Sequence, residues 1–241
     1  MNEIKIVNRK IGEKYSVFVI AEAGINHNGS FLIAKKLVNM AKKAGADCIK
    51  FQTHIVEKEM TKTKILPGKI SKTPLWDIIK NCELTANEEE KLSKYCKKKK
   101  ILFLSTPFSI SAIDRLEKIK MPAYKIGSGE LTNIPFLKHI AKKKKPVILS
   151  TGMSNMEEIK FAVELFKKSK TPLAILQTTS EYPCDYKDIN LGVISKYKKN
   201  FKIPIGISDH SLGIYTALGA VALGACIVEK HITLDKTMPD R

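Results

Sequence analysis

Eight short apolar runs that alternate with helix-length segments constrain the fold of this chain more than any other feature of its sequence. The runs are residues 17–21, 48–53, 101–106, 123–126, 146–152, 173–179, 203–210 and 226–231. Continuous apolar strands that alternate with helices are typical of a parallel sheet whose outer face is covered by helices. Eight such units in 241 residues favour a TIM (β/α)8 barrel over an open doubly wound sheet. The first run is also not followed by the G-x-G-x-x-G turn of a dinucleotide-binding fold.

Helix signals lie between the runs. Ser30 is a plausible N-cap for a helix that extends to Lys43, and Gly45 would end it. Further helices are predicted at 86–99, 110–119 and 133–143. We expect residues 1–16 to form an N-terminal β-hairpin and residues 17–241 to form the barrel domain. The pattern lapses between residues 55 and 85, and we interpret this long segment as a lid or rim over a site.

The composition is that of an ordinary globular protein, with 44% hydrophobic and 27% charged residues. No apolar run reaches the ~18 residues of a membrane span, and the N-terminus does not resemble a signal peptide, so we expect a cytoplasmic protein. The net charge of +18 comes from 42 lysines and arginines, of which only Arg9, Arg115 and Arg241 are arginines. Arginine is the residue that reads bases and clamps phosphates in pairs of hydrogen bonds, so nucleic acid is not an expected partner. Five cysteines without a C-x-x-C pair indicate neither a disulfide framework nor a zinc knuckle, and Cys48 and Cys226 are expected to be buried.

Polar side chains recur where these runs end. In a barrel, the carboxyl ends of all strands meet at one mouth, and active sites lie there. The polar residues that this geometry gathers are Glu22, Asn26, Lys50, Gln52, Thr106, Lys125, Ser128, Glu130, Ser150, Thr179, Ser180, Tyr182, Ser208, His210 and His231.

Lys50 and Lys125, together with several hydroxyl groups, suit a substrate that carries phosphate and carboxylate groups. The alternative for either lysine is an outward, solvated position. His210 and His231 end two neighbouring strands, where two imidazoles could share a divalent metal ion or make ordinary hydrogen bonds. Glu22 and Glu130 could transfer protons or bind sugar hydroxyls, or they could form salt bridges with the two lysines.

The chain resembles the sialic acid synthases in a series of motifs that runs from the first strand to the last residues. The motifs are E-A-G-I-N-H-N-G (22–29), K-F-Q-T-H (50–54), S-T-P-F-S (105–109), Y-K-I-G-S-G-E (124–130), L-S-T-G-M (149–153), T-S-E-Y-P (179–183), S-D-H-S (208–211) and E-K-H-I-T-L-D (229–235). Enzymes of this family are phosphoenolpyruvate-dependent transferases that condense phosphoenolpyruvate with an N-acetylated amino sugar such as N-acetylmannosamine. They release phosphate and use a divalent metal, usually Mn²⁺, with Mg²⁺ or Co²⁺ as alternatives.

The resemblance implies a role for each matching residue. His210 and His231 would be the metal ligands, and Glu22, Glu130 and Lys125 are the candidate catalytic residues. Tyr182 would contact the sugar or the attacking water together with the two glutamates. The residues that would hold phosphoenolpyruvate are Lys50, Thr106, Lys125, Ser128, Ser150, Ser180 and Ser208.

The resemblance also implies a homodimer and a small antifreeze-like C-terminal domain. This chain stops at Arg241, so we expect a barrel without its last helix and without that domain. The segment 55–85 favours N-acetylmannosamine as the sugar, while legionaminic or pseudaminic acid synthesis stays open. A Schiff-base aldolase that uses Lys125 or Lys50, and an inactive ligand-binding barrel, are the other hypotheses.

Overall fold

The structure is a computed structural model that describes residues 2–67 and 71–237. The chain divides into two compact units, each made of two segments. The first unit comprises residues 1–20 and 122–230, and the second comprises residues 21–121 and 231–241. The division into a hairpin and a barrel domain, predicted from the sequence, stays a prediction.

An antiparallel hairpin opens the chain, as the sequence predicts. It consists of β1 (Glu3–Ile6) and β2 (Arg9–Gly12). Ile4 lies opposite Ile11, and both side chains are buried, so one face of the hairpin is apolar.

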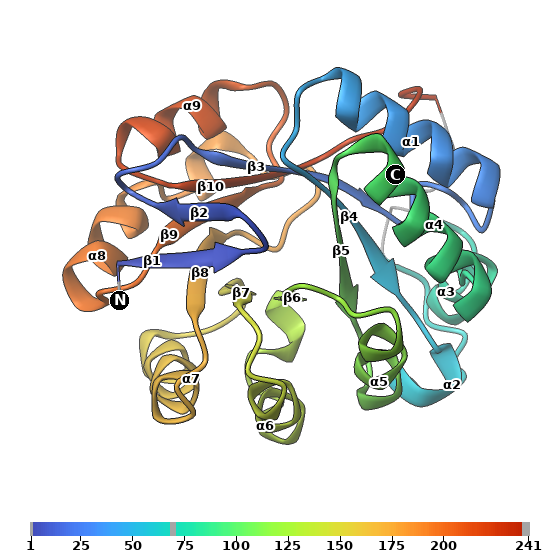
Figure 1. Ribbon diagram of the computed structural model, residues 1–241, viewed down its shortest axis with the longest axis horizontal. Helices are drawn as coiled ribbons and strands as arrows, with labels where there is room; N and C mark the ends of the chain where they lie inside the picture. The colour runs from blue at the N-terminus through green and yellow to red at the C-terminus, as the bar shows by residue number, and fades with distance from the viewer. Residues whose placement is uncertain (1, 68–70, 238–241) are drawn as a thin grey trace. The chain divides into compact units, whose positions relative to one another are not determined.

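Eight further strands form a second sheet (Figure 1). They are β3 (Phe18–Gly24), β4 (Cys48–Thr53), β5 (Leu102–Pro107), β6 (Tyr124–Ile126), β7 (Val147–Ser150), β8 (Leu173–Thr178), β9 (Ile205–Asp209) and β10 (Ile227–His231). Their order is β5-β4-β3-β10-β9-β8-β7-β6. Within the first unit β6 to β10 pair in parallel, and within the second unit β4 pairs in parallel with β5. The fold class is therefore α/β of the TIM (β/α)8 type, which confirms the prediction.

Helices follow the strands along the chain. They are α1 (Phe31–Lys43), α2 (Val56–Glu59), α3 (Leu75–Asn81), α4 (Ala86–Lys99), α5 (Ile110–Lys118), α6 (Ile134–Lys142), α7 (Met156–Lys168), α8 (Gly192–Asn200) and α9 (Tyr215–Ala222). Two short 3-10 turns, η1 (Ser128–Glu130) and η2 (Tyr186–Asp188), follow β6 and β8. Residues 232–237, which follow β10, contain no helix. None of the helices in the described ranges is long and apolar enough to cross a membrane.

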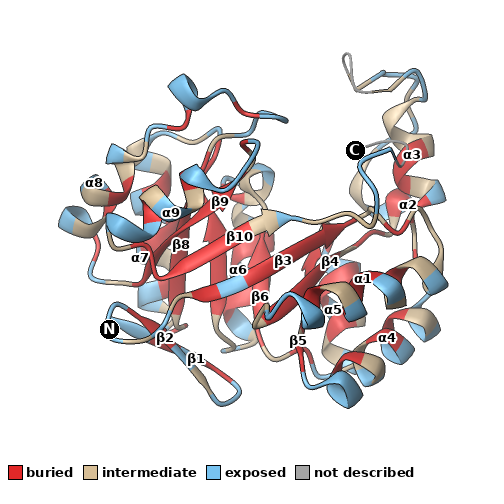
Figure 2. Ribbon diagram, turned by 90° about the horizontal axis from the view of Figure 1, so that it is seen from above, coloured by how far each residue is buried: buried red, intermediate tan, exposed pale blue. Residues whose placement is uncertain are grey.

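Helix α1 shows how residues close together in the sequence determine where a helix begins, which face it buries and where it ends. The Ser30 side chain accepts a hydrogen bond from the Ile33 N–H, which satisfies one free donor of the first turn. Leu37 and Val38 are fully buried, and each contributes roughly 1.5–3 kcal/mol through removal from water. Gly45 follows the helix with φ +81°, a conformation that favours glycine. In Figure 2 the strands of the eight-stranded sheet are mostly buried, and the helices expose one face.

The segment 55–85, interpreted from the sequence as a lid or rim over a site, has helical structure of its own, and its role stays a prediction. It contains the short helices α2 and α3, and its residues 68–70 lie outside the described ranges. Glu57 of α2 accepts a hydrogen bond of 2.6 Å from Lys80 of α3, and Lys62 lies 4.8 Å from the centroid of the Trp76 ring. The sequence analysis missed helices α2 and α3 because four and seven residues are too few to show a helical period.

Candidate active site

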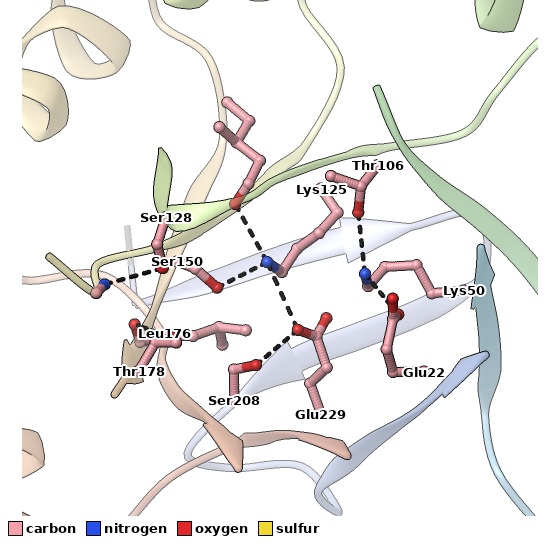
Figure 3. Close-up of polar contacts among 12 residues, drawn as sticks. Glu22, Lys50, Thr106, Lys125, Ser128, Ser150, Leu176, Thr178, Ser208 and Glu229 are labelled. Carbon is pink, nitrogen blue, oxygen red and sulfur yellow. Dashed lines mark hydrogen bonds and ion pairs between the residues drawn. The ribbon is translucent and has the colours of Figure 1, made fainter. Parts of the chain in front are cut away.

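Lys125 is the centre of a buried polar cluster in the first unit (Figure 3). It lies in β6 and is only 2% exposed. Its Nζ donates to Ser150 Oγ at 2.7 Å and to the Ile126 carbonyl at 3.1 Å. Because β6 and β7 pair in parallel, Ser150 at the end of β7 lies at the same level as the end of β6. The outward, solvated alternative for Lys125 is therefore wrong.

Glu229 is the acidic partner of Lys125, and our sequence reasoning did not select it as a site residue. Its Oε1 lies 3.6 Å from Lys125 Nζ and accepts a hydrogen bond of 2.8 Å from Ser208 Oγ. Glu229 and Ser208 are direct neighbours in the parallel pair β9–β10. The available signal was a carboxylate directly after the apolar residues Ile227 and Val228 of β10, because such a group is rarely buried without a partner.

Gly152 packs against two of the predicted phosphate contacts. Its backbone N–H donates to Ser128 Oγ at 3.0 Å. A Cβ atom at this position would lie 2.8 Å from Ser128 Oγ and would overlap Ser180 Oγ. Glycine thus allows two hydroxyl groups and a backbone donor to meet, which is an arrangement suited to anionic oxygens.

His210 and Tyr182 form a second contact group in the first unit. The rings stack with centroids 4.0 Å apart, and Tyr182 OH lies 2.9 Å from His210 Nε2. His210 Nδ1 lies 2.6 Å from the Thr179 carbonyl, which can only accept, so Nδ1 carries the proton. Burial lowers the pKa of His210 below its usual value, and this favours a neutral ring with an Nε2 lone pair.

Glu22, Lys50 and Thr106 form the corresponding cluster of the second unit (Figure 3). Lys50 Nζ lies 2.5 Å from Glu22 Oε2 and donates to Thr106 Oγ1 at 2.9 Å. Lys50 pairs with Leu104 in the β4–β5 register, so Thr106 follows two residues later on the same face. Both charged groups are nearly inaccessible, at 3% for Lys50 and 2% for Glu22, so the salt-bridge alternative for Glu22 is confirmed.

Two further predicted site residues, Glu130 and His231, have contacts other than those described above. Glu130, at the end of η1, accepts a hydrogen bond of 2.7 Å from Asn133, and the carboxylate that contacts Lys125 is Glu229. His231 ends β10 and is exposed, with its Cε1 3.8 Å from where a Cβ of Gly24 would be. All five cysteines are buried, which confirms the expectation for Cys48 and Cys226.

The donor chemistry of His210 fits a divalent transition metal. An imidazole whose Nδ1–H is held by a backbone carbonyl presents its Nε2 lone pair in the orientation that metal-binding histidines use. Among residues 2–67 and 71–237, no three His, Cys, Asp or Glu side chains gather closely enough to hold an ion by themselves. A bound ion would therefore need water or substrate oxygens as further ligands, as catalytic sites commonly have.

The fold and the two buried clusters define a TIM-barrel protein with lysine–glutamate pairs and hydroxyl groups at its strand ends. Comparison with known proteins gives its family. The NeuB family profile matches residues 37–241, and the chain belongs to the NeuB family. This confirms the resemblance seen in the sequence motifs.

Several relatives and structures are similar over almost the whole chain. It is 42% identical to the N,N'-diacetyllegionaminic acid synthase of Campylobacter jejuni, over 91% of this chain and 68% of that protein. It is 37% identical to the human N-acetylneuraminate-9-phosphate synthase, over 95% of this chain and 65% of that protein. A crystal structure of N-acetylneuraminic acid synthetase from Leptospira borgpetersenii, in complex with citrate, matches with a TM-score of 0.91 and 39% identity over 98% of this chain and 79% of that one.

Proposed function

We propose that the chain condenses phosphoenolpyruvate with an N-acetylated amino sugar to give a nonulosonic acid and phosphate. Family membership supports a synthase of this type. The observation that carries the proposal is the buried Lys125 ammonium, held by Ser150 and Glu229 beside further hydroxyl groups. A buried cation with neutral donors around it suits a small substrate with several anionic oxygens. The Leptospira relative was crystallised with citrate, another small polyanion.

The proposed reaction balances as follows. The C3 carbon of phosphoenolpyruvate forms a bond to the aldehyde carbon of the open-chain sugar, and a water oxygen adds to C2. The C2–phosphate bond then breaks and leaves a keto group. One water proton ends on the former aldehyde oxygen and the other on the released phosphate.

The residues of the first unit have defined tasks in this scheme. The Lys125 ammonium and the Ser150 hydroxyl would bind the anionic groups of phosphoenolpyruvate, and Ser128 and Ser180 would add donors next to Gly152. Ser208 would act with Glu229, which fixes its hydroxyl at 2.8 Å. Tyr182 OH would move a proton or bind the sugar. Preorganised donors of this kind stabilise developing charge without reorganisation.

Lys50, Thr106, Glu22 and Glu130 keep the roles that the family resemblance implies. Glu22 and Glu130 are the candidates for proton transfer. We also propose His210 and His231 as ligands of a divalent ion, Mn²⁺ first, with Mg²⁺ and Co²⁺ as alternatives. When bound, such an ion supplies Lewis-acid polarisation of the aldehyde oxygen.

The Schiff-base alternative is disfavoured by the contacts of the two lysines. A lysine nucleophile must lose its proton and keep a free lone pair. Lys50 contacts Glu22 at 2.5 Å and Lys125 contacts Glu229 at 3.6 Å, and a buried carboxylate favours the charged ammonium. The two lysine–glutamate pairs therefore support a role in which the lysines bind anions as ammonium groups, and not a role as amine nucleophiles.

The proposal is tested by phosphate release. The chain is incubated with phosphoenolpyruvate, Mn²⁺ and a panel of 2-acetamido and 2,4-diacetamido sugars, including N-acetylmannosamine. Release with one sugar, absent without sugar, supports the synthase and identifies the substrate. A folded chain that releases no phosphate with any sugar contradicts the proposal, and calorimetric binding without turnover would instead indicate a ligand-binding barrel.

A further inference from the structure

Strand β9 ends directly before His210, and an ion pair lies at that end. Asp209 of β9 is the register partner of Lys230 of β10, and Lys230 Nζ lies 2.7 Å from Asp209 Oδ2. The Asp209 side chain is 1% exposed and that of Lys230 is 28% exposed. Successive residues of a strand point to opposite faces, and the preceding residues, Ser208 and Glu229, contact each other in the candidate site. The Asp209–Lys230 pair therefore lies on the other face of the sheet.

Both members of the pair also hold Ser211, the residue after His210. Asp209 Oδ1 accepts hydrogen bonds from the Ser211 backbone N–H at 2.9 Å and from the Ser211 hydroxyl at 2.7 Å. Lys230 Nζ donates to the Ser211 carbonyl at 2.7 Å. Strand β9 has ended at this point, so the two side chains replace the backbone partners that a neighbouring strand would supply. The backbone is thus fixed immediately before and immediately after His210.

His210 has two further contacts, and both join it to the segment that follows β8. Its carbonyl accepts a hydrogen bond of 3.0 Å from the Cys184 N–H, and its Nδ1–H donates to the Thr179 carbonyl at 2.6 Å. Tyr182, which stacks on the His210 ring, lies between these two contact points along the chain. A shift of the His210 backbone would therefore change the direction of Nε2 and the position of Tyr182 together.

We propose that Asp209 and Lys230 are positioning residues that fix the backbone at His210 and so direct its Nε2 toward a divalent metal ion. The inference rests on the proposed function for the ion. Replacement of a buried ion pair by apolar groups is often neutral or stabilising, so the stability of the fold alone does not explain an Asp209 side chain that is 1% exposed. A pair that selects one backbone conformation does explain it, because supporting contacts around a metal ligand are commonly worth roughly 10–100-fold in metal affinity.

The first test compares variants of Lys230. Lys230→Met removes the donor, whereas Lys230→Arg keeps donors for both the Asp209 carboxylate and the Ser211 carbonyl. Mn²⁺ binding to the full chain is measured by electron paramagnetic resonance. We expect Lys230→Met to weaken Mn²⁺ binding about tenfold and Lys230→Arg to stay within about threefold of wild type. An unchanged affinity in Lys230→Met would overturn the inference.

Lys198→Met is the matched control. The Lys198 side chain is 31% exposed, a fraction similar to that of Lys230, and its Nζ lies 3.2 Å from Glu13 in an ion pair that contains no residue of the candidate site. We expect Lys198→Met to bind Mn²⁺ as the wild type does. A loss equal to that of Lys230→Met would overturn the inference, because it would show that metal affinity follows general stability.

A double variant separates positioning from folding. Lys230→Met alone leaves the Asp209 carboxylate buried without its cation, so a loss of Mn²⁺ binding would also follow from unfolding. Asp209→Asn combined with Lys230→Met removes both charges and keeps an acceptor for the Ser211 N–H, but it provides no donor for the Ser211 carbonyl. We expect this variant to recover most of the urea midpoint of the wild type and still to bind Mn²⁺ about tenfold more weakly. Recovery of both properties would overturn the inference, because the pair would then act only on stability.

The His210 ring gives a readout that needs neither metal nor turnover. Its Nδ1–H donates to the Thr179 carbonyl at 2.6 Å, so the proton should give a far downfield signal in spectra of the full chain labelled with ¹⁵N-histidine. His210→Asn assigns the signal by its loss. We expect the double variant to shift or broaden this signal and Lys198→Met to leave it in place. An unchanged signal in the double variant would overturn the inference. If the wild type binds no Mn²⁺ but the double variant changes the His210 signal, the positioning of His210 stands and only the metal of the proposed function fails.

Discussion

Lys125 Nζ lies 3.6 Å from Glu229 Oε1, and the two side chains are only 3% and 5% exposed. Taking both charges out of water costs several kcal/mol, and the cost is recovered only when each charge has a partner and further hydrogen bonds. Ser150 and Ser208 supply those bonds, one to each member of the pair. The Glu229 carboxylate and the two serines therefore offset the free-energy cost of a buried Lys125 ammonium at the strand ends.

Glu229→Gln should destabilise the protein by about 3 kcal/mol, because Lys125 then keeps a buried charge without its partner. The same variant should bind inorganic phosphate several-fold more tightly, since the pocket gains one positive charge. Urea denaturation and calorimetry measure the two effects. Glu164→Gln on α7 is the control, because Glu164 is 52% exposed and its contact with Lys167 is a surface pair worth at most about 1 kcal/mol. Similar losses in both variants would show that Glu229 does not balance Lys125.

Gly152→Ala should weaken phosphoenolpyruvate binding by at least about tenfold. Its methyl group would lie 2.8 Å from Ser128 Oγ and overlap Ser180 Oγ, so both hydroxyls must move at a cost of about 1–3 kcal/mol. Gly192→Ala is the matched control, since nothing lies within 4 Å of a Cβ at Gly192. KM for phosphoenolpyruvate and the urea midpoint are compared for the two variants. Unchanged binding in Gly152→Ala would remove Ser128 and Ser180 from the phosphate site.

Borohydride should trap no pyruvate adduct on Lys125 or Lys50. Each ammonium contacts a buried carboxylate, at 3.6 Å for Lys125 and 2.5 Å for Lys50, so neither offers a free amine lone pair. The chain is treated with pyruvate and borohydride, digested, and examined by mass spectrometry. A mass increase on a peptide that contains either lysine would favour the aldolase mechanism instead.

The strand ends could be predicted because the periodic pattern is strong where strands are buried on both faces. The predicted strand 48–53 coincides with β4, and Lys50 and Lys125 both point into buried clusters. Position at a strand end was enough to select them, since a barrel leaves few other places for a charge in an apolar strand.

Partners between distant strands could not be predicted from one sequence. Glu229 was missed because its contact with Lys125 joins β10 to β6, and no local spacing encodes that contact. His54 lacked a partner in the sequence reasoning because Glu59 lies in α2, a helix of 4 residues that gives no periodic signal. Such contacts depend on tertiary packing, whereas helix caps such as Ser30 depend on residues three positions apart.

Glu89→Gln should remove a pH dependence of stability between about pH 4.5 and 7. Burial raises the pKa of Glu89 from 4.5 to about 7, although Arg115 lies 3.6 Å away. In this range the folded protein binds more protons than the unfolded chain, so the contribution of Glu89 is present below pH 4.5 and lost as pH rises through 7. A shift of this size corresponds to up to about 3 kcal/mol. Urea denaturation at closely spaced pH values measures it.

The contribution of Glu89 is the difference between wild type and Glu89→Gln in the slope of unfolding free energy against pH. The difference is needed because His27 gives this slope the opposite sign. Burial lowers the pKa of His27 from 6.5 to about 4, so its contribution is lost as pH falls through that range. Glu90→Gln, one residue further along α4, is the control: Lys94 lowers the pKa of Glu90 below 4.5, so this variant should leave the slope between about pH 4.5 and 7 unchanged. If wild type and Glu89→Gln show parallel curves, Glu89 is ionised in the folded protein and Arg115 outweighs its burial.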